Sequence, residues 1–271
     1  MEQKPKKQNV TKTFTKLALP MLACAVMLYS SCRKNENAPA PVNKTAQTNS
    51  TTTPTNSDLS KAIAINLAHS IGGAYGGVNL TTGVDSLSLA SHLGPHNDFE
   101  SPALCGLFTD SLVNFSNKQG DTTSHTGGNL TFYFNCDNGK PSGYIAYDSL
   151  ATTRQAHSWY DQFYVKQAYT IKCLDDKHQF IGVNGDNYFY EYNQVTCGCG
   201  EKVITIQNCN FVLNNLTIDV CKKDILSGTA TFTAYGEGWH VSGTLVFIGN
   251  HTANVTIGGD TFQINTLRYS W

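Results

Sequence analysis

Apolar and polar residues alternate with a period of two over much of the C-terminal half of the chain. The clearest stretch is 228–266, where Ala230, Phe232 and Ala234 alternate with threonines. A period of two places successive side chains on opposite faces of an extended strand. Similar runs occur at 130–136, 143–150, 159–166, 168–174, 179–183, 187–195, 203–212 and 216–221. The pattern therefore predicts many short β-strands.

Glycine, asparagine and aspartate separate these runs. They are the residues that most readily adopt the positive φ angles of tight turns. Short connections pair strands that are neighbours in sequence. We therefore predict a mainly β fold, an antiparallel up-and-down meander forming a curved sheet, half-barrel or sandwich, and prefer it to a Greek-key sandwich. The expected turns include Asp137-Asn138-Gly139, Asn184-Gly185-Asp186, Gly236-Glu237-Gly238, Gly249-Asn250 and Gly258-Gly259-Asp260.

One helix is expected before the strands. Four large apolar residues recur at four-residue spacing, which is typical of one buried helical face: Leu59, Ile63, Leu67 and Ile71. Ser57 or Asp58 can cap the start of this helix, and Gly72-Gly73 can end it. Residues 78–128 show no clear period.

The N-terminus has the three parts of a secretory signal. Five lysines lie within residues 1–16, residues 17–29 are apolar, and Ser30-Ser31-Cys32 follow. The apolar run of 13 residues is shorter than the roughly 20 that a membrane-spanning helix needs. We predict that 1–31 is a lipoprotein signal peptide and that Cys32 is lipidated. Lipidation of Cys24, or an ordinary cleaved signal, are the alternatives.

Charge and composition limit the possible partners. Residues 1–31 contain five lysines and one glutamate, so the 19 basic and 20 acidic residues of the whole chain become 14 and 19, a net charge of −5. An acidic chain does not favour nucleic acid, which requires a clustered basic surface. Residues 32–57, rich in Asn, Thr and Pro, should form the lipidated tether. Residues 58–271 should form a single β-rich domain.

The chain resembles outer-membrane lipoproteins of the Bacteroidota. The resemblance rests on Ser30-Ser31-Cys32, the Thr/Asn/Pro tether, AIAINLAHSIGGAYGG and YTIKCLDDKHQFIGVNG. It implies an address in the cell envelope and no particular activity. Arg33 follows the cysteine in place of the aspartate that retains some lipoproteins in the inner membrane. We therefore expect lipid anchoring to the outer membrane.

Seven cysteines remain for the folded domain, and an exported chain meets an oxidising compartment that favours disulfides: Cys105, Cys136, Cys173, Cys197, Cys199, Cys209 and Cys221. If a hairpin turns at Asn215, Cys209 and Cys221 lie directly opposite and can bond. A metal held by Cys197 and Cys199 with one of those two thiols is the alternative. We predict no metal and no cofactor.

Aromatic residues suggest a surface for a ligand. Tyr188, Tyr190 and Tyr192 share one face of a predicted strand, and Trp159 precedes them. Flat rings with a polar rim suit sugars and lipids, although the same face could instead pack on the core or form cross-strand aromatic pairs. Four short Asp-Ser or Asp-Thr motifs resemble an O-glycosylation signal of exported Bacteroidota proteins, at Ser86, Ser111, Thr122 and Ser149.

The sequence contains no recognisable catalytic motif, so three functions compete. The first is a non-catalytic envelope lipoprotein that binds a glycan, a protein or another envelope component. The second is a carrier with an apolar cavity inside a curved sheet. The third is a hydrolase, which requires two carboxylates, or a histidine and a nucleophile, converging in a cleft. Oligomeric state does not follow from the sequence.

Overall fold

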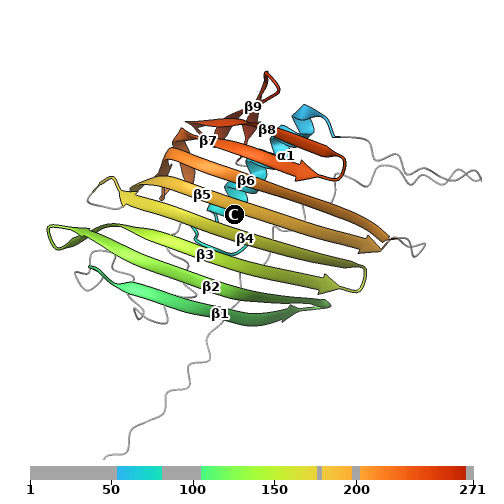
Figure 1. Cartoon of the computed structure of the whole chain (residues 1–271), viewed down its shortest axis with the longest axis horizontal. Helices are drawn as coiled ribbons and strands as arrows, with labels where there is room; N and C mark the ends of the chain where they lie inside the picture. Colours follow the sequence, from blue (N-terminus) through green and yellow to red (C-terminus); the bar gives the residue numbers. More distant parts are fainter. Residues whose placement is uncertain (1–53, 81–104, 176–178, 197–201, 267–271) are drawn as a thin grey trace, which may run out of the picture. The chain divides into compact units, whose positions relative to one another are not determined.

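The computed structural model describes residues 54–80, 105–175, 179–196 and 202–266. They form one antiparallel sheet of ten strands in the order of the chain, together with one helix (Figure 1). Each strand pairs with its neighbour in sequence, so the predicted mainly β meander is confirmed. The strands are β1 (Phe108–Gln119), β2 (Thr122–Asp137), β3 (Lys140–Ala156), β4 (Trp159–Cys173), β5 (Phe180–Thr196), β6 (Lys202–Asp219), β7 (Asp224–Gly236), β8 (Trp239–Gly249), β9 (Thr252–Ile257) and β10 (Asp260–Asn265).

The sheet is open, because β1 pairs with β2, β10 pairs with β9, and the two end strands do not pair with each other in the described residues. Four of the predicted turns join consecutive strands. Between β2 and β3, Asn138 and Gly139 have φ values of 50° and 75°, as a two-residue turn that matches the twist of a hairpin requires. The turns at 236–238, 249–250 and 258–260 are also confirmed.

Several predicted strands are parts of longer ones. β4 covers the predicted run 159–166 and all but the last residue of 168–174, and β5 runs through the predicted turn Asn184-Gly185-Asp186. The strand shifts its register there, between Val183 and Gly185. Gly185 has a φ of 140° and lies so close to β4 that a side chain would overlap the carbonyl oxygen of Ala168. The glycine therefore serves a β-bulge, which needs the same backbone freedom as a turn.

A second bulge lies beside the first. β6 continues through Asn214-Asn215, where a hairpin turn was predicted, and Asn215 has a φ of 50°. The backbone N–H of Asn215 donates to the side-chain oxygen of Asn184 at 2.8 Å. The asparagine side chain thus joins the irregular parts of β5 and β6, and such bulges bend the strands that carry them.

The helix α1 (Asn56–Ile71) confirms the helix predicted before the strands. The predicted cap at Ser57 or Asp58 is wrong, because the helix begins earlier and the side-chain oxygen of Thr55 accepts from the backbone N–H of Asp58. Gly72 caps the end, as predicted. The predicted apolar positions of α1 are buried in the main core with residues from every strand except the two end strands. α1 contacts β5, β9 and β10 and lies behind the sheet in Figure 1. We call this covered side the inner face of the sheet and the opposite side the outer face.

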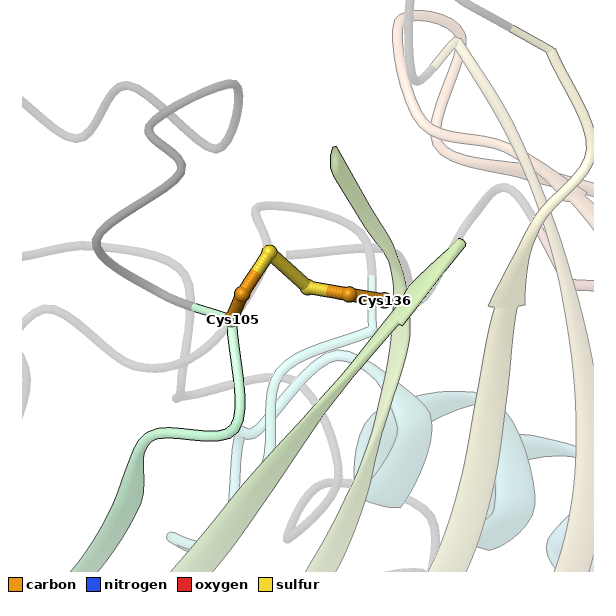
Figure 2. Close-up of a disulfide and its surroundings, with 2 residues drawn as sticks. All are labelled: Cys105 and Cys136. Atoms are coloured by element: carbon orange, nitrogen blue, oxygen red, sulfur yellow. A yellow bond between two sulfur atoms is a disulfide. The ribbon is translucent and has the colours of Figure 1, made fainter. Parts of the chain in front are cut away.

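A disulfide joins the segment before β1 to the end of β2. Cys105 and Cys136 are bonded, with their Cα atoms 5.4 Å apart (Figure 2). They are 31 residues apart in sequence, and closing a loop of that length in the unfolded chain corresponds to about 3–4 kcal/mol of stabilisation. β1 itself was not predicted, because residues 108–119 carry only weak alternation.

Candidate functional site

A group of tyrosines lies on the outer face of the sheet. Tyr188, Tyr190 and Tyr192 are half-buried, whereas Phe189 between them is fully buried on the inner face. β4 contributes Tyr160 and Tyr164 to the same outer surface, since these residues pair in register with outer residues of β5. We call these five residues the tyrosine face.

The rings of the tyrosine face touch across the two strands. Tyr164 is directly opposite Tyr190, and its ring meets the ring of Tyr188 edge-on with centroids 5.9 Å apart. Tyr160 and Tyr192 make a similar contact at 6.0 Å. These are cross-strand aromatic pairs, so one of the structural interpretations from the sequence is confirmed. Packing of the three β5 tyrosines on the core is not, because the core lies on the other face.

Polar groups surround the rings. The hydroxyls of Tyr164 and Ser149 are hydrogen bonded at 2.8 Å, and Tyr192 donates to the side-chain oxygen of Gln194 at 3.2 Å. Partial burial raises the pKa of Tyr188, and the neighbouring Tyr190 and Tyr164 add to the rise. The hydroxyl of Tyr188 is therefore neutral near pH 7 and able to donate or accept a hydrogen bond.

The same register line continues onto the following strands. Tyr190 is opposite Asn208 of β6, which is opposite Tyr235 of β7, which is opposite His240 of β8. Tyr235 is 41% exposed, and its ring stacks on His240 with centroids 4.4 Å apart. Aromatic and amide side chains thus follow one line across β4 to β8 on the outer face.

Trp159, the fourth member of the predicted platform, belongs to the inner face. The guanidinium of Arg154 lies 5.9 Å from its ring and 4.5 Å from the ring of Phe163. Trp159 pairs in register with Ala156 and Val195. It lies two residues before Asp161 of the inner face in the same strand, so the two side chains are on the same face of the sheet. The structure therefore separates Trp159 from the three predicted tyrosines.

An inner-face polar cluster surrounds that arginine. Arg154 forms an ion pair with Asp161 at 2.7 Å, with side chains 26% and 9% exposed. The side-chain amide of Asn193 also donates to Asp161, and that of Gln207 donates to Glu191. Sequence reasoning did not select Arg154 or Asp161, although both are charged residues at inward positions of the period-two pattern.

Burial governs the electrostatics of this cluster. It raises the pKa of Asp161, while Arg154 and Asn193 offset part of the rise. It also raises the pKa of Glu191, where the hydrogen bond from Gln207 lowers it and the charge of Asp161 raises it further. The two carboxylates are diagonal neighbours on paired strands, but each is held by another side chain. The cluster is therefore organised as a buried polar network that orients its own members.

A second network holds the segment after α1 against the inner face. The backbone N–H of Val78 is shared by two side-chain oxygens, at 2.8 Å from Asp148 and 2.7 Å from Gln167. Gln167 in turn donates to the carbonyl and hydroxyl oxygens of Ser70. Residues 72–80 are thus fixed to β3 and β4 by contacts that span many tens of residues in sequence.

An aromatic contact completes the covering of the inner face. Tyr75 stacks on Phe163 and Phe189 with ring centroids 5.1 and 4.3 Å away, and its hydroxyl donates to Asn66 of α1 at 3.0 Å. Val78 and Leu80 are fully buried. α1 and this segment therefore occupy the part of the inner face where a carrier would hold an apolar ligand.

The predicted disulfide between Cys209 and Cys221 is wrong. β6 does not turn at Asn215, so Cys209 lies opposite Phe189 and Ala234 and is buried, while Cys221 is exposed beyond the end of β6. Burial raises the pKa of the Cys209 thiol to about 12, and the charge of Glu191 adds to it. The pair Cys105–Cys136 confirms a disulfide within the predicted set.

The remaining predicted site residues lie either in the strands or outside the described residues. Cys173 ends β4, and Ser111, Thr122 and Ser149 lie in β1, β2 and β3. Cys32, Ser86, Cys197 and Cys199 lie outside the described residues. Where the structure is described, His, Cys, Asp and Glu form no group of three or more suited to a metal ion, and no helix has the length and apolar character to cross a membrane.

Comparison with known proteins gives no relative. No protein-family model, no curated protein and no solved structure matches the chain. The function must therefore be argued from the chain's own residues.

Proposed function

We propose that this chain is a lipid-anchored lipoprotein of the outer membrane that binds a glycan, without catalysis, through its tyrosine face. The observation that carries the proposal is the position of the five tyrosines on the side of the sheet that does not contact the core. Half-buried rings at such a position contribute little to the core, whereas they offer apolar area to a partner.

The chemistry around the rings suits a polyhydroxylated ligand. Lys166 and Asn210 flank Tyr188, and Gln162 is opposite Tyr192. Amide and ammonium groups can bond sugar hydroxyls while the ring faces contact the apolar C–H surfaces of the sugar. A glycan is therefore better matched than a purely apolar ligand, which would leave these polar groups without partners.

The two other functions have less support. A carrier needs space on the inner face where α1, Tyr75 and Val78 pack. A hydrolase needs carboxylates that are available to a substrate, whereas Asp161 and Glu191 are engaged by Arg154 and Gln207. Binding through the outer face requires no rearrangement of either region.

Binding can be tested with the full chain in detergent. The probes are peptidoglycan sacculi and a panel of insoluble α- and β-glucans, with bound protein measured after sedimentation of the polymer. A variant that carries both Tyr164→Ala and Tyr190→Ala should bind at least tenfold more weakly, since central aromatic residues dominate interface energies. Tyr133→Ala is the matched control, because Tyr133 is 44% exposed on the outer face of β2, outside the tyrosine face.

Equal loss of binding in the control variant, or no binding of the unmodified chain to any of these polymers, would contradict the glycan proposal. The anchor is tested separately by acyl labelling in cells. Cys32→Ala should abolish labelling, whereas loss of labelling in Cys24→Ala alone would move the anchor to Cys24. Fractionation with the inner membrane would contradict the proposed location.

A further inference from the structure

The unpaired edge of the sheet at β1 differs from the opposite edge at β10. β1 has 12 residues, pairs only with β2 among the described strands, and contains no proline and no irregular register. β10, at the opposite edge, has six residues and is contacted by α1. Long regular edges are templates for pairing with another strand, and proteins usually shorten, bend or cover them.

The hairpin after β1 fixes which backbone groups point to the edge. Gln119 and Thr122 close a two-residue loop, Gly120-Asp121. Such a loop is closed by a hydrogen-bonded pair, and hydrogen-bonded residues alternate along an antiparallel strand. The odd-numbered residues of β1 therefore form backbone hydrogen bonds with β2. The even-numbered residues from Phe108 to Lys118 direct their N–H and C=O groups toward the unpaired edge of the sheet.

We propose that β1 pairs with β1 of a second copy of this chain, antiparallel and centred on Asn114. In that register Asp110 lies directly opposite the partner's Lys118, and the two-fold symmetry gives the same ion pair twice. Asp110 and Lys118 are the only charged residues of β1. The strand is thus complementary in charge to itself.

Apolar contacts agree with the same register. Val113 would lie opposite the partner's Phe115, again twice by symmetry, and Phe115 is 41% exposed in the single chain. A shift of one residue would pair even-numbered with odd-numbered residues, so the free N–H and C=O groups of the two strands would not meet, and the inner face of one copy would join the outer face of the other. Centring the pair on Val113 would set Asp110 opposite the partner's Ser116, and centring it on Phe115 would set Asp110 opposite the partner's Gly120, so both ion pairs would be lost.

The first test measures the mass of the full chain in detergent by sedimentation, corrected for bound detergent. A dimer is expected. Asp110→Lys should weaken association about tenfold or more, since like charges would then lie directly opposite at two places. Combining it with Lys118→Asp should restore the dimer. The double variant also shows that a loss of association in the single variant does not come from misfolding.

The second test locates the centre of the pair by oxidative cross-linking of the full chain. Asn114→Cys should give a covalent dimer joined through the two introduced thiols, because opposite residues have Cα atoms about 5.5 Å apart, within the range of a disulfide. Ser116→Cys on the same edge is the control and should give none, since its two copies lie four positions apart. Peptide masses distinguish this bond from any through the native thiols.

A monomer at every concentration tested would overturn the proposal, including the case in which another part of the chain covers β1. A dimer that is insensitive to Asp110→Lys, or that cross-links through Ser116→Cys and not through Asn114→Cys, would also overturn it. Restoration by the charge exchange together with the Asn114→Cys cross-link would establish it.

Discussion

Replacing Asp148 with asparagine should remove a large pH dependence from the stability of the domain. Asp148 is 4% exposed on the inner face, and its two carboxylate oxygens accept from the backbone N–H groups of Val78 and Gln167. Burial raises the pKa of Asp148 from 3.8 to about 7, although both hydrogen bonds lower it. The neutral carboxylic acid is therefore the form that the fold favours.

The sign and size of the effect follow from this difference. Between pH 4 and pH 7 the folded chain keeps a proton on Asp148 that the unfolded chain has lost, so the free energy of unfolding falls as the pH rises. Each tenfold difference in proton affinity corresponds to 1.36 kcal/mol. A pKa of about 7 instead of 3.8 thus gives a fall of about 4 kcal/mol at most. Above the folded pKa the free energy should level off.

The assay is chemical denaturation of the full chain and of the Asp148→Asn variant from pH 4.5 to 8.5. Asparagine has no proton to lose, but its amide nitrogen cannot accept one of the two N–H groups, so the variant should be about 1–3 kcal/mol less stable at low pH. Its disadvantage should shrink or reverse by pH 8. Asp161 and Glu191 titrate in both proteins and cancel in the difference. A difference between the two proteins that is constant across this range, or that grows with pH, would refute the reasoning.

Three further outcomes can be measured on the same protein. Gly77→Ala should destabilise the domain by more than about 3 kcal/mol in thermal unfolding, because Gly77 has a φ of 90° and a side chain there would lie 2.5 Å from the side-chain oxygen of Gln167. Tyr75→Phe should lower the free energy of unfolding by about 1 kcal/mol, because one hydrogen bond is lost. Tyr75→Ala should lower it clearly more, because the ring stacks on two phenylalanines. Equal losses in the two variants would contradict this. Alkylation of the folded chain should label Cys221, which is exposed, and spare the buried Cys209 until the chain unfolds, as peptide mass spectrometry can show.

The strand pattern was predictable from sequence because one face of the sheet meets the core. Alternation identified most of the strands, and the Asn138-Gly139 hairpin followed from turn chemistry. The turns predicted at Asn184-Gly185 and Asn214-Asn215 were wrong, because residues that tolerate positive φ occur in β-bulges as well as in turns. The wrong hairpin at Asn215 led directly to the wrong disulfide.

The tyrosine face could be predicted in part. Three tyrosines two residues apart must share a face, but which face meets the core depends on neighbouring strands. The polar network around Asp148 was not predictable, because its partner Val78 lies 70 residues away. A buried carboxylate in a strand looks like a break in the apolar pattern until the segment that binds it is known.

The position of α1 determines the order in which this domain can form. The sheet consists of hairpins between neighbouring strands, which need only short loop closures, whereas α1 packs against β9 and β10 almost 200 residues further along the chain. Contacts of such long range are slow to form, so α1, which is synthesised before the strands, should dock last. Interactions between α1 and the final strands should then be nearly absent from the transition state. Strengthening them should leave the folding rate unchanged and slow unfolding, prolonging the lifetime of the folded chain.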